Sequence, residues 1–247
     1  MAYPSGPKSA AVPAVVRRLA AGRPVHAVWR NELGDLTFRI AHGAEFVKVT
    51  TRESADFANE ARRLRWAGRY IAVPPVLSFG VDGARRPYSA WLHTRGLSGL
   101  SAVHPRWQAA PGTAVRAIAV GLRTMHDALP VATCPFDWSV ASRLPLLLPA
   151  HRANLPDQPP IEKLVVCHGD ACAPNTLISD VGTYCGHVDF GELGIADRWA
   201  DLAVATLSLG WNYPGHNWET EFFTAYGIEP DPVRIDYYRR LWQDPDL

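Results

Sequence analysis

The stretch Val165–Leu177, VVCHGDACAPNTL, begins and ends with short apolar runs and places His168, Asp170 and Asn175 between them. The apolar runs are typical of two buried strands joined by a loop. Two kinds of chemistry could use polar residues in this loop. One is metal binding through cysteine and histidine, and the other is phosphoryl transfer through aspartate and asparagine.

A zinc site is the weaker of the two interpretations. The candidate ligands are Cys167, His168, Cys172, Cys185 and His187. Adjacent residues of an extended strand point to opposite sides, so Cys167 and His168 cannot both face one ion. The CxxC and HxxxH spacings of common zinc sites are also absent. A plain Asp–Asn turn without chemistry is a further alternative.

Phosphoryl transfer fits the spacing of the loop. His168-Gly169-Asp170 and Asn175 reproduce the pattern H-x-D-x-x-x-x-N of a kinase catalytic loop, and Asp189-Phe190-Gly191 follows 14 residues after the asparagine. In that pattern the Asp accepts the proton of the acceptor hydroxyl, and the Asn offers an oxygen to Mg²⁺. Asn175 and Asp189 are expected on neighbouring strands, where their hard oxygen ligands would hold Mg²⁺ from two sides.

The upstream sequence supplies the other parts that a kinase needs. Lys48 lies in the third of three extended runs that predict an antiparallel meander, and Glu60 lies near the middle of the helix predicted next. Glu60 could orient Lys48 toward the α- and β-phosphates of a nucleotide. The phosphate-covering turn is weaker, because a single glycine, Gly34, stands in place of GxGxxG.

The order of the predicted elements indicates an α+β fold with two lobes. The first, residues 1–95, is a small antiparallel β lobe with one helix and is expected to bind the nucleotide. The second, residues 96–247, is larger and mostly helical, holds a β-hairpin, and is expected to carry catalysis and substrate binding; a connector is expected near 91–96. Helices are predicted over 12–21, 54–70, 113–129, 196–208, 217–226 and 231–242, and strands over 25–31, 36–42, 45–50, a hairpin in 74–94 turning at Asp82-Gly83, and the runs VVCHGD, NTLIS and YCGHVDF.

Composition sets broad limits. No apolar run approaches the ~18 residues of a membrane span, and the N-terminal residues lack the apolar core of a signal peptide. We therefore expect a cytoplasmic protein without a membrane partner. The four cysteines form no CxxC pair, so free thiols are expected.

The segments HGDACAPNTL, HVDFGELGIADRWADLAVA and FFTAYGIEPDPVRIDYYRRLW resemble the aminoglycoside phosphotransferases, especially the 3'-type, and the likeness runs from about Trp29 to Trp242. After DFG the chain enters a helix without room for an activation loop, which disfavours a protein kinase. The resemblance implies a protein-kinase-like bilobal fold, ATP (or GTP) with Mg²⁺, and phosphorylation of a hydroxyl on a cationic aminoglycoside. It implies no nucleic-acid partner, and we expect a monomer or weak dimer.

The resemblance also assigns roles by position. Asp170 is the catalytic base, Asn175 and Asp189 are the metal ligands, and Lys48 with Glu60 forms the nucleotide pair. A hinge near Trp91–Thr94 would hold adenine through its backbone, which places Leu92 and Thr94 at the nucleotide. Asp197 and Asp201 are expected to brace the loop and the following helix.

The charge pattern suggests where the acceptor binds. From Asp189 to the end, 11 acids stand against four bases, a net charge of −7, whereas the first 188 residues carry +8. An acidic C-terminal region would attract a polyamine, and Glu192 and Asp244 are the expected contacts. Glu192 stands where many 3'-type enzymes have Arg, and Trp242-Gln243 precedes Asp244, so a related kinase of another alcohol, such as a different antibiotic or choline, is the alternative. A catalytically silent binding protein is disfavoured by the intact set Lys48, Asp170, Asn175 and Asp189.

Overall fold

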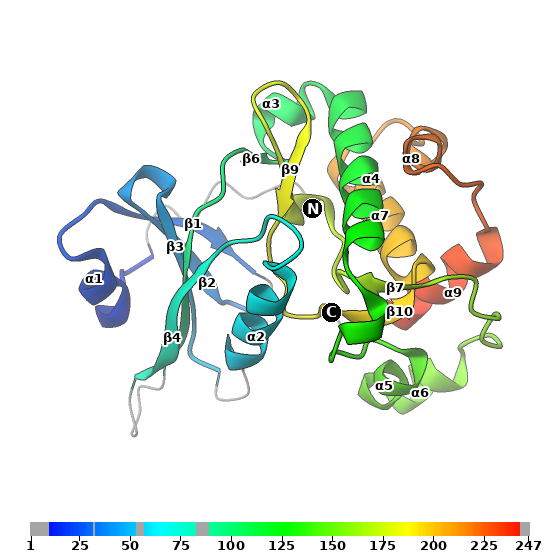
Figure 1. The fold of residues 1–247 in the computed structure, drawn as a ribbon, viewed down its shortest axis with the longest axis horizontal. Coiled ribbons are helices and arrows are strands. Elements are labelled where there is room, and N and C mark those ends of the chain that lie inside the picture. Colours follow the sequence, from blue (N-terminus) through cyan, green and yellow to red (C-terminus); the bar gives the residue numbers. More distant parts are fainter. Residues whose placement is uncertain (1–9, 32, 53–56, 83–88, 243–247) are drawn as a thin grey trace. The chain divides into compact units, whose positions relative to one another are not determined.

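The computed structural model describes residues 10–31, 33–52, 57–82 and 89–242. The chain divides into two compact units, one ending at Leu97 and the other beginning at Ser98. The first unit is built around a sheet of strands in the order β1-β2-β3-β5-β4, all antiparallel (Figure 1). Its elements are α1 (Ala14–Ala20), β1 (Val25–Arg30), β2 (Leu36–Ile40), the 3₁₀ turn η1 (Ala41–Gly43), β3 (Glu45–Thr50), α2 (Phe57–Ala67), β4 (Val76–Asp82) and β5 (Ser89–Arg95).

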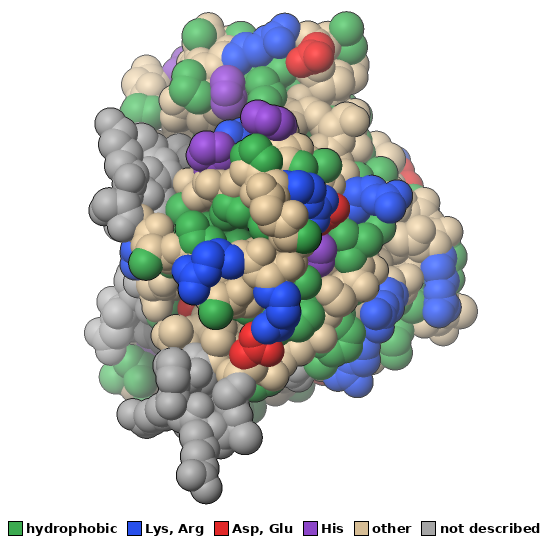
Figure 2. All heavy atoms as spheres, turned by 90° about the vertical axis from the view of Figure 1, so that its left-hand side faces the viewer, with side chains coloured by type: hydrophobic (Ala, Val, Ile, Leu, Met, Phe, Trp, Pro, Cys, Tyr) green, Lys and Arg blue, Asp and Glu red, His purple; other side chains and the backbone are tan. Residues whose placement is uncertain are grey.

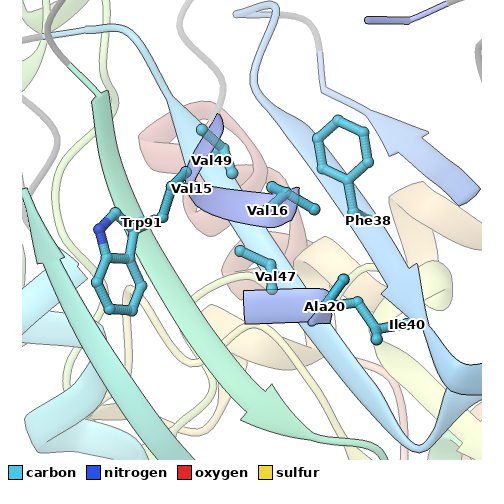
Figure 3. Packing of buried hydrophobic residues seen from close by; sticks show 8 residues of the cluster. All are labelled: Val15, Val16, Ala20, Phe38, Ile40, Val47, Val49 and Trp91. Carbon is cyan, nitrogen blue, oxygen red and sulfur yellow. The ribbon is translucent and has the colours of Figure 1, made fainter. Parts of the chain in front are cut away.

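Side-chain alternation on β3 decides which residue faces the core of the first unit. Val47 and Val49 are buried in a cluster with Val15, Val16 and Ala20 of α1, as Figure 3 shows. Phe38, Ile40 and Trp91 of the neighbouring strands complete it. Because successive residues of a strand point to opposite faces, Lys48 is directed away from this cluster, toward the side where it meets α2.

The second unit is mostly helical and carries two small antiparallel sheets, β10-β7 and β6-β8-β9. Its elements are β6 (Leu100–Ser101), α3 (Pro105–Gln108), α4 (Pro111–Ala128), η2 (Val131–Thr133), α5 (Val140–Arg143), η3 (Leu144–Leu146), α6 (Pro149–Ala153), β7 (Leu164–Cys167), η4 (Ala173–Asn175), β8 (Thr176–Ile178), β9 (Tyr184–His187), β10 (Gly194–Asp197), α7 (Trp199–Asn212), α8 (Glu219–Tyr226) and α9 (Pro232–Trp242).

Helix α7 lies at the centre of the second unit. Nearly all its residues are buried, including Asp201, Ser208 and Asn212, which is typical of a helix enclosed by its neighbours. Helix α9 packs along it, and α4 packs against α8 and β9. Gly121 of α4 allows this close approach, because a Cβ there would lie 2.5 Å from the ring of Tyr184. The catalytic loop is therefore built on a rigid helical base.

The α+β fold class predicted from the sequence is confirmed, and two local predictions need correction. Residues 91–94 do not form a connector but lie inside β5, paired with β3 on one side and β4 on the other. The segment after DFG does not enter a helix directly. Gly194–Asp197 first forms β10, which pairs with β7, and α7 begins only at Trp199. The predicted turn at Asp82-Gly83 runs into residues 83–88, outside the described part of the chain.

The charge asymmetry follows the division into units. Residues 1–97 carry 15 Lys and Arg against 7 Asp and Glu, so the whole surplus of +8 belongs to the first unit. Figure 2 shows the side on which α1 lies, where Lys and Arg side chains are spread widely and acids are sparse. Among the helices of the described residues, none has the length and apolar character that crossing a membrane requires.

Candidate active site

The loop between β7 and β8 carries the His168-Gly169-Asp170 motif. Gly169 adopts a φ of +82°, and a Cβ there would lie 2.2 Å from the carbonyl oxygen of Glu192, so only glycine fits. The backbone N–H groups of His168 and Gly169 donate to the two carboxylate oxygens of Asp201, at 2.6 Å and 2.9 Å. Asp201 thus fixes the backbone just before Asp170, the bracing role expected of it.

Asp201 is itself held in a fully buried hydrogen-bond network. Its Oδ2 also accepts from His126 Nε2 at 2.9 Å, and Nδ1 of that histidine contacts the hydroxyl of Tyr226 at 2.8 Å. Burial alone would raise the pKa of Asp201. The hydrogen bond from His126, together with the electrostatic effect of His126 and His168, holds that pKa below its ordinary value. The loop is therefore tied to α4, α7 and α8 through one ionised carboxylate.

Asp170 is in a different electrostatic state. Its Oδ2 and its carbonyl oxygen both accept from Asn175 Nδ2, at 3.0 Å each, whereas its Oδ1 has no hydrogen-bond partner among the described residues. Burial and the nearby charge of Asp189 raise the pKa of Asp170. A half-buried carboxylate with one unpartnered oxygen and a raised proton affinity is suited to accept a proton.

The hairpin β8–β9 brings Asn175 and the DFG sequence together. The prediction that Asn175 and Asp189 lie on neighbouring strands is wrong, because Asn175 ends η4 just before β8 and Asp189 lies two residues after β9. Val188 donates its backbone N–H to the carbonyl of Asn175 at 2.9 Å, and its own carbonyl accepts from His168 Nε2 at 2.9 Å. Asp189 follows with a φ of +67°, a left-handed conformation that is uncommon for aspartate. Phe190 is fully buried and packs on the ring of His168 at 4.9 Å. This backbone sets the direction of the Asp189 side chain.

These residues fit Mg²⁺. The amide nitrogen of Asn175 is turned toward Asp170, which leaves the amide oxygen available as a ligand. The carboxylate of Asp189 is a hard oxygen donor of the kind that this ion prefers. Asn175 and Asp189 would hold the ion, as the sequence suggests.

In the first unit, the structure brings Lys48 and Glu60 together. Lys48 Nζ lies 2.7 Å from Glu60 Oε1, and the carboxylate of Glu60 is almost fully buried. The other residues predicted to bind the nucleotide show no comparable contact in the described part of the chain. Gly34 lies in the turn after β1 with a φ of +86°. Leu92 and Thr94 are buried residues of β5, and each is paired with a residue of β3 and a residue of β4.

The predicted acceptor contacts are only partly described. Glu192 lies against the catalytic loop, and its Oε2 is 2.7 Å from Nη1 of Arg143. Asp244 lies outside the described residues. Most other acids of the C-terminal segment are occupied. Asp197 accepts from the backbone of Glu162 and Trp199, and a hydrogen bond joins Glu221 to His216. Ion pairs join Glu219 to Arg239, Asp231 to Arg234 and Asp236 to Arg240. The −7 of the sequence is therefore not a surface of free carboxylates.

The zinc interpretation finds no support in the described part of the chain. Among the described residues, no three of the cysteines and histidines named for it could hold one ion, and the one group of potential ligands there is His126, Cys167 and Asp201. Both ring nitrogens of His126 are already hydrogen-bonded, and Cys167 Sγ donates to the carbonyl of Asp197. All four cysteines are free thiols, as expected.

Comparison with known proteins agrees with this geometry. The model of the phosphotransferase enzyme family matches residues 15–238, nearly the whole chain. The chain belongs to this family. An aminoglycoside 3'-phosphotransferase of Streptomyces fradiae is 30% identical to it over 87% of this chain and 93% of the relative. The resemblance to the aminoglycoside phosphotransferases is thereby confirmed.

Solved structures of the family share the fold. An aminoglycoside 3'-phosphotransferase of type VIII superposes with a TM-score of 0.73 and 28% identity, covering 89% of this chain and 93% of the other. An aminoglycoside phosphotransferase of Streptomyces rimosus in complex with ADP and streptomycin gives a TM-score of 0.66 and 26% identity, over 92% and 96% of the two chains. The protein-kinase-like fold is therefore shared along nearly the full length.

Sequence reasoning missed two features of the phosphotransferase site. His126 and Tyr226 support Asp201, but each lies in an ordinary amphipathic helix, and only spatial proximity reveals their role. Arg143 was also missed, because it lies 49 residues from its partner Glu192 in a segment that shows no motif. A signal was present for Arg143 alone, because the resemblance leads one to expect an arginine at the position of Glu192, and an acid in its place calls for a compensating cation.

Proposed function

We propose that this phosphotransferase uses ATP and Mg²⁺ to phosphorylate a hydroxyl of an aminoglycoside, which inactivates the antibiotic. The observation that supports the proposal is the geometry of Asp170, whose Oδ1 has no hydrogen-bond partner among the described residues while Asn175 holds Oδ2. Matches to aminoglycoside phosphotransferases over most of the chain support the choice of acceptor.

In the proposed reaction, the oxygen of the acceptor hydroxyl attacks the γ-phosphorus of ATP while Asp170 accepts the proton of that hydroxyl. The bond between the γ-phosphorus and the β–γ bridging oxygen breaks, and ADP leaves. The raised pKa of Asp170 strengthens it as a base, and Asn175 keeps the carboxylate in one orientation. Asp201 holds the backbone in front of it, so the base is positioned before the acceptor arrives. Phosphoryl transfer depends on such positioning more than on covalent chemistry by the protein.

The proposal also gives several residues a role toward the nucleotide and its metal ion. Lys48, oriented by Glu60, would pair with the phosphate oxygens, and the net charge of +8 on residues 1–97 favours a triphosphate. Asn175 and Asp189 would hold Mg²⁺, which when bound neutralises charge on the phosphates. We keep Glu192 and Asp244 as proposed acceptor contacts and Leu92 and Thr94 as proposed neighbours of the nucleotide.

A product assay tests the proposal. The purified chain is incubated with ATP or GTP, with and without Mg²⁺, and a panel of aminoglycosides, and ADP or GDP release is coupled to mass spectrometry and NMR of the product. We expect one phosphate on one hydroxyl, formed only with Mg²⁺. Transfer to choline or another alcohol, with none to any aminoglycoside, would show that the acceptor is not an aminoglycoside. One observation favours this second candidate: C-terminal acids that could attract a polyamine are already paired with cations.

A further inference from the structure

The starting point is the short segment after DFG. Strand β10 pairs with β7 in the register Gly194↔Cys167, which brings Glu192 alongside Gly169. The contact is intimate, because a Cβ on Gly169 would lie 2.2 Å from the carbonyl oxygen of Glu192 and 2.8 Å from its Cβ. The side chain of Glu192 therefore leaves the backbone next to the residue that precedes the proposed base, and 52% of it is exposed.

The cation that pairs with Glu192 is held in place from several sides. The segment that leads to α5 is fixed on β10, because Trp138 donates its backbone N–H to Ile195 and the N–H of Ile195 donates to Phe136. The guanidinium of Arg143 then lies 4.8 Å over the ring of Trp138, which is 1% exposed, and only 21% of the Arg143 side chain is exposed. Arg143 is a fixed part of the site.

This pairing changes what Glu192 can recognise. A guanidinium 2.7 Å from the carboxylate cancels most of its field for any second cation. The surrounding segment offers little compensating charge. The carboxylate of Asp137 accepts from the backbone N–H and the hydroxyl of Ser139, and residues 138–156 contain three basic residue positions, Arg143, His151 and Arg152, but no Asp or Glu. A carboxylate in such a pair still accepts a hydrogen bond from a neutral hydroxyl.

We propose that Arg143 is a specificity-determining residue, which neutralises Glu192 and so selects an acceptor that presents a hydroxyl, and not an ammonium group, to this carboxylate. The inference rests on the proposed function and narrows its substrate class to aminoglycosides with few amines next to the phosphorylated ring position. It also explains why Glu192 does not act as a second unpaired acid beside Asp170, since Arg143 donates to its carboxylate.

The test uses two aminoglycosides that differ only by a hydroxyl or an amine at one ring position near the phosphorylated hydroxyl. Calorimetric affinity and phosphate transfer are measured for the wild type, Arg143→Gln, Arg143→Lys and the double variant Arg143→Gln/Glu192→Gln. Arg106→Gln is a matched control, because Arg106 also lies 4.8 Å over a buried tryptophan, Trp107, and also pairs with an acid, Asp180 at 3.4 Å, but in the β8–β9 turn. Melting temperatures check that each variant folds.

We expect Arg143→Gln to shift the affinity ratio toward the amine compound by about 5-fold or more, the size of one ion-pair interaction. Arg143→Lys should keep the wild-type ratio, and the double variant should lose the shift because the carboxylate is gone. An unchanged ratio in Arg143→Gln, a shift that persists in the double variant, or an equal shift in Arg106→Gln would overturn the proposal. Failure of the proposed function shows separately, as an absence of phosphate transfer by the wild type, whereas the present inference is read from the affinity ratio.

Discussion

Asp170 and Glu192 lie on adjacent backbone segments of one unit, yet their carboxylates are in opposite electrostatic states. Asp170 is hydrogen-bonded by a neutral amide, lies near the charge of Asp189 and has a raised pKa. Glu192 is paired with the guanidinium of Arg143 at 2.7 Å. Within this unit, the carboxylate that we propose as the base is held by a neutral amide, whereas the carboxylate of Glu192 is neutralised by a cation.

The largest effect is expected from removing the carboxylate of Asp170. Asp170→Ala should lower kcat by about 10²-fold or more, with little change in nucleotide affinity, because the base acts in the transition state. Asp180→Ala, an acid in the exposed β8–β9 turn, is the control and should keep kcat near the wild-type value. Near-normal turnover in Asp170→Ala would remove that residue from the role of base.

A buried acid and an exposed one can be compared through stability. Asp201→Ala leaves two backbone N–H groups and His126 without their shared acceptor, so the free energy of unfolding should fall by about 3–5 kcal/mol. Asp236→Ala breaks an exposed pair with Arg240 and should cost less than about 1 kcal/mol. Chemical denaturation measures both. Equal losses would show that Asp201 does not brace the loop.

In the first unit, the hydrogen bonds of Glu45 should make the stability of the fold depend on pH. Hydrogen bonds from Arg23, together with that from His93, lower the pKa of Glu45 from 4.5 to about 2. Because the pKa of Glu45 is lower in the folded protein, the ionised carboxylate stabilises the fold. This contribution to the free energy of unfolding is fully present above pH 4.5 and is lost as the pH falls toward 2.

The variant Glu45→Gln should lose about 1–2 kcal/mol of unfolding free energy at neutral pH, a figure reduced for the 38% exposure of Arg23. Its stability should also fall less steeply than that of the wild type between pH 4.5 and about 2. Denaturant titrations across this range check both points. Parallel pH profiles for the two proteins would contradict the assignment.

The smallest effect is expected at Glu192. Because Arg143 already neutralises it, Glu192→Gln should change the KM for an aminoglycoside by less than about 3-fold, and raising the salt concentration should not alter that ratio. Steady-state kinetics at two salt concentrations measure it. A large, salt-sensitive rise in KM would mean that Glu192 acts as a free anion toward the acceptor.

The surroundings of Asp170 could be predicted from the sequence, whereas those of Glu192 could not. Asp170 and Asn175 stand just before the β8–β9 hairpin and the DFG sequence just after it, so local geometry brings them together. Lys48 meets Glu60 because strand β3 and helix α2 follow each other along the chain. The pairing of Glu192 with Arg143 spans 49 residues and depends on how the segment before α5 docks on β10. A charge count cannot show which acids find a cation, and strand β10 was missed because four residues carry little periodicity.

The most direct test of the account is phosphate transfer by the wild type and by Asp170→Asn under single-turnover conditions, with ATP labelled at the γ-phosphate and Mg²⁺ and an aminoglycoside in excess. Asparagine preserves the shape of the side chain but cannot accept the proton as a carboxylate does. The account predicts a labelled phosphate on one hydroxyl of the aminoglycoside with the wild type, and transfer slower by about 10²-fold or more with Asp170→Asn although the nucleotide still binds. Equal rates in the two proteins would contradict it.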